Sequence, residues 1–129
     1  MRLDGKTIKK IVNCPAMIIA MGVFLMILLR ADIAHAAGPI AINDTNFPDP
    51  IFRSIIANTY DYNGNGYIEQ DEIDMTMNIV CEGKGVSSVK GIEFFTEIQG
   101  LWVMDNNISS LDVSKNVHLH GIWCSGNPI

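Results

Sequence analysis

The sequence lacks the motifs of known catalysts and has few cysteines and few basic residues. We find no paired acid/base set, no nucleophile motif and no phosphate-binding loop. The sequence therefore predicts a protein that is not an enzyme, and no catalytic residue is expected. Three cysteines and nine Lys or Arg are present among 129 residues, and the positions of both groups are informative.

Most of the basic residues lie at the N-terminus. Four of them, within the first ten positions, precede an apolar stretch over residues 11–29, and the triplet Ala34-His35-Ala36 follows. This order is typical of a secretory signal peptide, so we predict that residues 1–36 are removed by cleavage. The alternative is an uncleaved membrane anchor, because the apolar stretch approaches the ~20 residues that span a bilayer. A secreted or cell-surface protein is expected in either case.

Removal of this segment would leave an acidic chain. Residues 1–36 hold five of the nine basic and two of the fourteen acidic residues, so the remaining 93 residues would carry 4 basic and 12 acidic residues, a net charge of −8. Such a surface disfavours nucleic acid and anionic membranes as partners. Contact with a membrane is expected only through the signal or an uncleaved anchor. A chain of this length can form one small domain.

The most specific motif is a calcium-binding loop. Residues 61–72, DYNGNGYIEQDE, match the EF-hand pattern D-x-[DN]-x-[DN]-G-x5-E at every specified place. Calcium requires about six to eight oxygen ligands, and Gly66 supplies the sharp turn between them. The predicted ligands are the side chains of Asp61, Asn63, Asn65, Glu69 (directly or through water) and Glu72, together with the backbone carbonyl of Tyr67.

A polar turn is the alternative interpretation of this loop, because Asn-Gly-Asn-Gly marks a loop in any protein. That interpretation predicts neither the carboxylate of Glu72 at the last ligand position nor the apolar Ile68. We therefore expect calcium as the cofactor.

Local patterns place helices on both sides of the loop. Residues 37–46 read as an extended leader. Asp49 is a suitable N-cap and Pro50 a suitable first residue for a helix that should end near Tyr60. Ile73 and Met77 are assigned to a short exiting helix, so residues 47–77 form an EF-hand-like helix-loop-helix.

Residues 78–129 contain about two and a half leucine-rich repeats. The pattern L-x-x-L-x-L-x-x-N-x-L fits residues 98–108 and, 21 residues later, residues 119–129, with Ile, Val and Cys also at apolar positions. Residues 76–86 form a degraded first copy that Thr76 and Lys84 interrupt.

Each repeat predicts a short strand whose side chains alternate between two faces. Leu101 and Val103 should point into the core, and Asn106 and Asn127 should turn inward at the bend to bond backbone groups. The returning segment should add a second layer of core residues: Ile108, Leu111, Val113 and Leu119.

The cysteines that follow the signal are expected to be core residues. Cys81 and Cys124 occupy the same inward strand position two repeats apart. Two strand spacings give ~10 Å, which exceeds the ~7 Å limit between the Cα atoms of a disulfide. Cys14 would leave with the signal.

Three outward residues are candidates for binding a partner. Trp102 and Trp123 occupy equivalent positions on neighbouring strands, and Met104 follows on the same face. The two rings either form a recognition stripe on the concave sheet or serve only as a stabilising cross-strand pair. His118 and His120 lie in a loop with no ligand constellation near them, so we expect solvated side chains.

The chain resembles bacterial secreted leucine-rich-repeat proteins of the internalin-like, cell-surface kind. The resemblance depends on Asn46-Phe47-Pro48-Asp49, the calcium loop, and Leu111 to Asn116 with the flanking strands. It implies secretion, a solenoid and contact with a protein or glycan at the surface, without a common chemistry. The chain differs in having fewer than three repeats and no wall-sorting segment, so we expect a truncated gene or a fragment.

Together these features predict an α+β fold, with an EF-hand-like helix-loop-helix cap followed by a short leucine-rich-repeat solenoid. The predicted function is a secreted, monomeric, calcium-binding module that recognises a protein or glycan with its concave face. A dockerin-like assembly module and the non-catalytic N-terminal part of a larger secreted enzyme are the alternatives.

Overall fold

The computed structural model describes residues 38–129. The predicted signal peptide and Cys14 lie outside the described residues. Among the described residues, no helix has the length and apolar character needed to cross a membrane.

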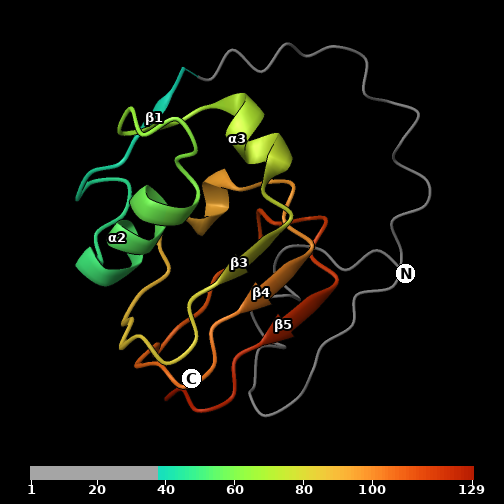
Figure 1. Ribbon diagram of the computed structural model, residues 1–129. Coiled ribbons are helices and arrows are strands. Elements are labelled where there is room, and N and C mark those ends of the chain that lie inside the picture. Colours follow the sequence, from blue (N-terminus) through green and yellow to red (C-terminus); the bar gives the residue numbers. More distant parts are fainter. Residues whose placement is uncertain (1–37) are drawn as a thin grey trace.

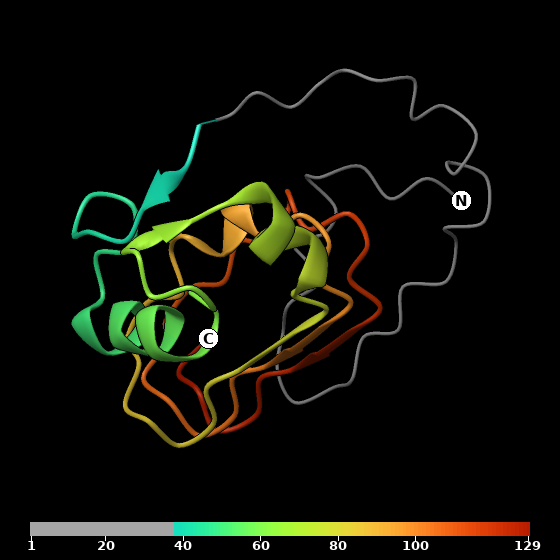
Figure 2. The ribbon, with the colours of Figure 1, turned by 45° about the horizontal axis from the view of Figure 1, so that its top comes forward.

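Two short helices and a two-stranded sheet precede a three-stranded parallel sheet (Figure 1). The small sheet pairs β1 with β2, and the larger one has the order β3-β4-β5. Figure 2 shows the helices on the β3 side of the larger sheet, away from β5. The elements are β1 (Ile40–Ala41), α2 (Pro50–Thr59), β2 (Tyr67–Ile68), α3 (Gln70–Met75), β3 (Asn78–Val80), the 3-10 helix η1 (Ile92–Phe94), β4 (Gly100–Trp102) and β5 (Gly121–Trp123).

Helix α2 begins and ends where the sequence predicts. One carboxylate oxygen of Asp49 accepts hydrogen bonds from the N–H groups of Ile51 and Phe52, both at 2.9 Å. Pro50 occupies the first helical position, where no backbone donor is needed. The N–H of Tyr60 closes the last turn by donating to the carbonyl of Ile56.

Helix α3 ends earlier than predicted. Its start is fixed by a reciprocal capping box between Glu69 and Glu72, but the backbone becomes extended at Thr76. The assignment of Met77 to this helix is therefore wrong, and its side chain is 42% exposed. Thr76 is the first position of the degraded repeat, where it is buried and its hydroxyl donates to the Glu72 carbonyl at 2.7 Å. The helix ends here because the chain must become extended before it enters β3 at Asn78.

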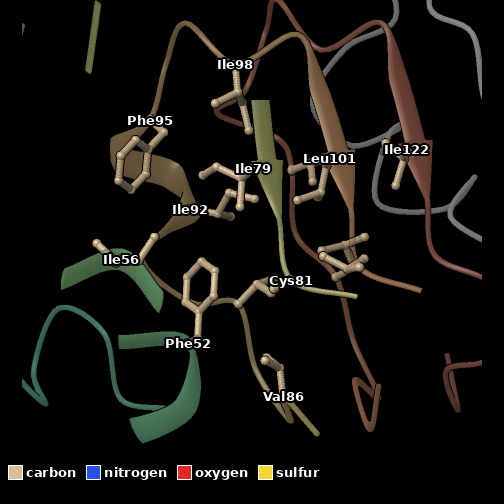
Figure 3. Packing of buried hydrophobic residues seen from close by; sticks show 14 of the residues in the cluster. Phe52, Ile56, Ile79, Cys81, Val86, Ile92, Phe95, Ile98, Leu101 and Ile122 are labelled. Atoms are coloured by element: carbon tan, nitrogen blue, oxygen red, sulfur yellow. The ribbon is translucent and has the colours of Figure 1, made fainter. Parts of the chain in front are cut away.

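The three repeats align in the register that the sequence predicts. Asn78, Gly100 and Gly121 are paired across β3, β4 and β5, which places successive copies side by side. The middle residues of the strands are buried and point toward the core between the sheet and the returning segments (Figure 3): Ile79, Leu101 and Ile122.

Asn106 satisfies the backbone at the bend between repeats. Its side-chain amide donates to the carbonyl of Cys81 at 2.8 Å, and also to two carbonyls of its own repeat. Its amide oxygen accepts from the N–H groups of Lys84 and Val86 at 3.1 and 3.0 Å. Asn127 repeats the arrangement one copy later, donating to Val103 at 2.7 Å. The inward orientation predicted for both asparagines is confirmed.

An aromatic cluster joins the helical segment to the repeats. The ring of Phe47 lies 6.4 Å from that of Phe52 in α2, and 5.8 and 6.5 Å from those of Phe94 and Phe95. The chain passes Phe47 at Gly91, whose φ is +107° and whose added Cβ would lie 2.2 Å from the Phe47 ring. A side chain at position 91 would therefore displace the ring. The helices and the repeats share one core.

Replacing Asn106 with alanine should remove hydrogen bonds from five buried or half-buried backbone groups. We expect the free energy of unfolding to fall by about 2–4 kcal/mol, measured by urea unfolding. Asn107→Ala is the matched control, because that neighbouring side chain is exposed. Equal losses in the two variants would contradict this role for Asn106.

Asp49 should make the stability of the fold depend on pH. Burial raises the pKa of Asp49, but N–H donors from Phe52, Ser87, Ser88 and Ile51 outweigh it, and the pKa lies below its ordinary value of 3.8. A lowered folded-state pKa stabilises the fold above pH ~4, and that contribution is lost as the pH falls through the folded-state value.

The measurement compares the wild type with Asp49→Asn in melts from pH 7 to pH 2.5. We expect the variant to be less stable by about 1–3 kcal/mol at pH 7, with the gap narrowing below pH ~4. Asp44→Asn, at an exposed position, is the control. A gap that stays constant over this range would rule out the carboxylate as its source.

Candidate functional site

The loop over residues 61–72 has the turns that a calcium loop requires. One carboxylate oxygen of Asp61 accepts from the N–H groups of Gly64 and Asn65 at 2.7 and 3.2 Å. The other accepts from Gly66 at 2.8 Å. Both glycines have positive φ, +70° at Gly64 and +84° at Gly66, a conformation that glycine adopts without strain. Asp61 thus anchors the first half of the loop.

The two loop asparagines continue the turn. The side-chain oxygen of Asn63 accepts from the N–H of Asn65, and that of Asn65 accepts from the N–H of Tyr67, both at 2.9 Å. The Asn63 amide donates to the carboxylate of Glu69 at 3.0 Å. These contacts bring four of the predicted ligand residues into one closed loop.

Glu72 is the buried acid of the loop. Its side chain is only 1% exposed. One oxygen accepts from the N–H groups of Tyr62 and Asn63 at 2.7 and 3.4 Å, and the other accepts from Glu69 at 3.0 Å. All its partners within residues 38–129 are backbone donors, and none is a cation. A buried carboxylate in this position favours a nearby positive ion.

The donor chemistry of the loop fits calcium, although its acids do not converge on a point. Within the described residues, no three His, Cys, Asp or Glu side chains form a cluster that could hold a metal ion. The predicted ligand set depends in part on amide and carbonyl oxygens, which a hard cation accepts. Calcium binding here stays a prediction.

The leader residues pair with the loop, which the sequence did not indicate. Ile40 aligns with Ile68, and Ala41 with Tyr67, in an antiparallel pair. The N–H of Ile42 extends the contact to the Gly66 carbonyl at 3.0 Å. The leader strand is therefore the β-strand neighbour of the loop in the described part of the chain. The only available signal was the alternation of Ile40 and Ile42 in a short apolar segment.

Tyr60 connects the loop to the first repeat. It immediately precedes Asp61, and its hydroxyl accepts a hydrogen bond from the N–H of Val80 in β3 at 2.9 Å. Its ring packs edge-on against Phe95 at 6.1 Å, and burial raises the pKa of its hydroxyl. The residue that begins the loop segment is thus tied to the first repeat strand by one hydrogen bond and one ring contact.

The two tryptophans lie side by side on the larger sheet. The rings of Trp102 and Trp123 are stacked, with centroids 4.2 Å apart and planes at 6°. Both side chains are half-buried, as is Met104 beyond β4. Val80 lies in the same row on β3 and is 52% exposed. The two tryptophans lie at the predicted outward positions, and they also form a cross-strand pair.

A shallow cleft of about 270 Å³ runs beside the stacked rings. The polar residues at this cleft were not identified from the sequence as candidates for binding. The available signal was a glycine two positions before each tryptophan, which leaves space above the strand. The cleft is lined by Asn78, Gln99, Gly100, Trp102, His120, Gly121 and Trp123.

Cys81 serves the core. It is buried and free, and burial, helped by the charge of Asp49, raises the pKa of its thiol to about 11. A thiol with this pKa stays protonated and unreactive at neutral pH. Cys124 is buried at the equivalent position of the third repeat.

Comparison with known proteins finds no matching family model. Internalin J of Listeria monocytogenes serotype 4b (strain F2365) is 29% identical over 70 residues, which are 54% of this chain and 8% of that protein. The chain therefore spans a small part of its curated relative.

Solved structures extend the similarity to the fold. An internalin C2 and an internalin F, both from Listeria monocytogenes, each match 72% of this chain at 25% identity and a TM-score of 0.62, over 42% and 28% of their own lengths. A domain of InlJ from the same species, described as including a cysteine ladder, matches 64% at 26% identity and a TM-score of 0.55, over 18% of its length. The chain is similar to internalins in sequence and has an internalin-like leucine-rich-repeat structure.

Proposed function

We propose that this chain is a secreted or cell-surface recognition module that binds a protein or glycan partner with the concave face of its repeats. The observation that carries the proposal is the half-buried, stacked pair of Trp102 and Trp123 on an internalin-like sheet. Concave faces of solenoids are extended binding surfaces, and tryptophan is enriched among the residues that dominate binding energy.

The stack also stabilises the sheet, but this does not account for its exposure. A cross-strand aromatic pair contributes about 0.2–1 kcal/mol. Both tryptophan side chains keep some solvent-accessible surface. A purely structural pair gains nothing from that exposure, whereas a recognition surface requires it.

We further propose that calcium rigidifies the cap. Asp61, Asn63, Asn65, Glu69, Glu72 and the Tyr67 carbonyl would hold the ion, which would supply the positive charge that buried Glu72 lacks. Two asparagines in place of aspartates reduce the charge of the site, so the affinity should be in the weak range of extracellular modules, with a Kd of ~10⁻⁴–10⁻³ M.

The shared core favours a cap over an independent assembly module. Phe47 and Tyr60 from the helical segment both contact Phe95 of the repeats. A dockerin-like module would carry its own core and a second calcium loop. No observation within residues 38–129 favours that alternative.

Calcium should stabilise the repeats as well as the loop. A ligand that binds only the folded state at ten times its Kd adds ~1.4 kcal/mol, so the melting temperature should rise. The measurement follows the fluorescence of Trp102 and Trp123, which lie outside the loop, alongside calorimetry for one calcium site per chain. Glu72→Gln should abolish both effects, and Asp71→Asn, at an exposed position on the same helix, should retain them.

Two results would count against this coupling. If the Glu72→Gln variant binds calcium with the same affinity as the wild type, the loop is not the calcium site. If chelation melts the helices while the tryptophan transition stays in place, the loop is not coupled to the repeats.

Removing the tryptophan pair should weaken recognition strongly and leave the fold intact. Trp102→Ser/Trp123→Ser would be compared with wild type on arrays of cell-surface proteins and glycans. Truncation of central aromatic anchors often costs ~2 kcal/mol or more, so we expect binding at least ~30-fold weaker. Val117→Ser, which removes a 63%-exposed residue of the returning segment, is the control. Full retention of binding by a folded double variant would refute the concave-face proposal.

A further inference from the structure

We propose that the cleft beside the tryptophan stack is a subsite for an uncharged sugar. This inference rests on the proposed function, because it specifies the ligand class at the same concave face. Its first support is the lining: amides of Asn78 and Gln99, the imidazole of His120, two glycines and the two indoles.

The lining is uncharged on a chain that is strongly acidic. The protein has 14 acidic and 9 basic residues, yet among residues 38–129 no Asp, Glu, Lys or Arg lines this cleft. His120 is the only titratable residue in the described part of the lining. An ionic ligand would lose hydration on entering without meeting an opposite charge, which is costly. The lining therefore selects a neutral, polar ligand.

The orientation of the rings leaves hydrogen-bond donors free. A Cβ added at Gly100 would lie 2.3 Å from Cζ3 of Trp102, and one at Gly121 would lie 2.5 Å from Cη2 of Trp123. The benzene end of each indole therefore lies against the strand backbone, two residues before its own Cα. Neither indole N–H donates a hydrogen bond within residues 38–129, and neither nitrogen is a buried, unpaired atom. Two donors are thus available to a ligand.

The remaining polar groups complement these donors. Asn78 lies at one end of the cleft, where its Oδ1 is 2.7 Å from the Cβ position above Gly100. Primary amides both donate and accept, as sugar hydroxyls do. The two indoles also supply apolar ring surface in the lining, against which the C–H groups of a sugar can pack. Amide and indole hydrogen bonding beside an apolar surface fits a hydroxyl-rich, uncharged ring.

An extended peptide fits the cleft less well. Strand addition uses the backbone groups of a free sheet edge, whereas the cleft lies on the face of the sheet, across residues of β3, β4 and β5. A peptide bound here could use only side-chain contacts, without the backbone bonds that give strand addition its affinity. The sugar therefore accounts for more of the lining.

The test uses tryptophan fluorescence titration of the full chain with neutral hexasaccharides: maltohexaose, cellohexaose and mannohexaose. We expect at least one to change the emission of the stack and bind saturably. Gln99→Ala and Asn78→Ala should each weaken that binding about three- to tenfold, as expected for one lost hydrogen bond to a neutral group. Val117→Ser should bind like wild type, and thermal melts would verify that every variant is folded.

The outcomes separate the sugar inference from the proposed function. If no neutral hexasaccharide binds while a protein partner is captured by wild type and lost in the double tryptophan variant, the sugar subsite is refuted and concave recognition stands. Preferential binding of an anionic oligogalacturonate would equally overturn the uncharged-ligand inference. Sugar binding that survives in the folded double variant would place the site elsewhere and refute it.

Discussion

The carboxylate of Asp49 joins the helical segment to the repeats, and the rest of the structure depends on this contact. One oxygen accepts from Ile51 and Phe52 and starts α2, and the other accepts from Ser87 and Ser88 at 2.8 and 3.1 Å. A single side chain therefore fixes the direction of the helix and the turn of the first repeat together. The Phe47 cluster packs around this junction, so burial and hydrogen bonding enforce the same orientation.

The helical segment covers the outer edge of the first repeat strand. The outer edge of a parallel sheet presents unpaired N–H and C=O groups that attract other strands. At β3, the hydroxyl of Tyr60 accepts from Val80, and α2 covers the neighbouring core. Because Tyr60 is adjacent to Asp61, any ordering of the loop acts directly on the residue that covers this edge. The proposed effect of calcium on the repeats can therefore be transmitted through Tyr60 alone.

Local patterns predicted the features that depend on neighbouring residues in sequence. Asp49-Pro50 determined the start of α2, and the repeat spacing determined the strand register and the inward Asn106. The pairing of β1 with β2 was not predictable, because each strand has two residues and only tertiary contact selects the partner. Of the candidate site, the sequence indicated the tryptophans but not the cleft, because it does not show how a side chain lies along its own strand.

In β4 and β5, the residues that fill the core and the residues of the proposed recognition face follow separate patterns. The inward positions of β4 and β5 are Leu101 and Ile122, whose burial satisfies the repeat pattern. The outward positions of both strands read Gly-x-Trp, and the absent side chain at the glycine gives the ring its place against the backbone. The first copy reads Asn-Ile-Val over the same positions and keeps the inward residue but neither outward one. The cleft ends at Asn78, where the outward residues change while the inward apolar residue continues. The proposed binding face can therefore vary while the residues that fill the core stay the same.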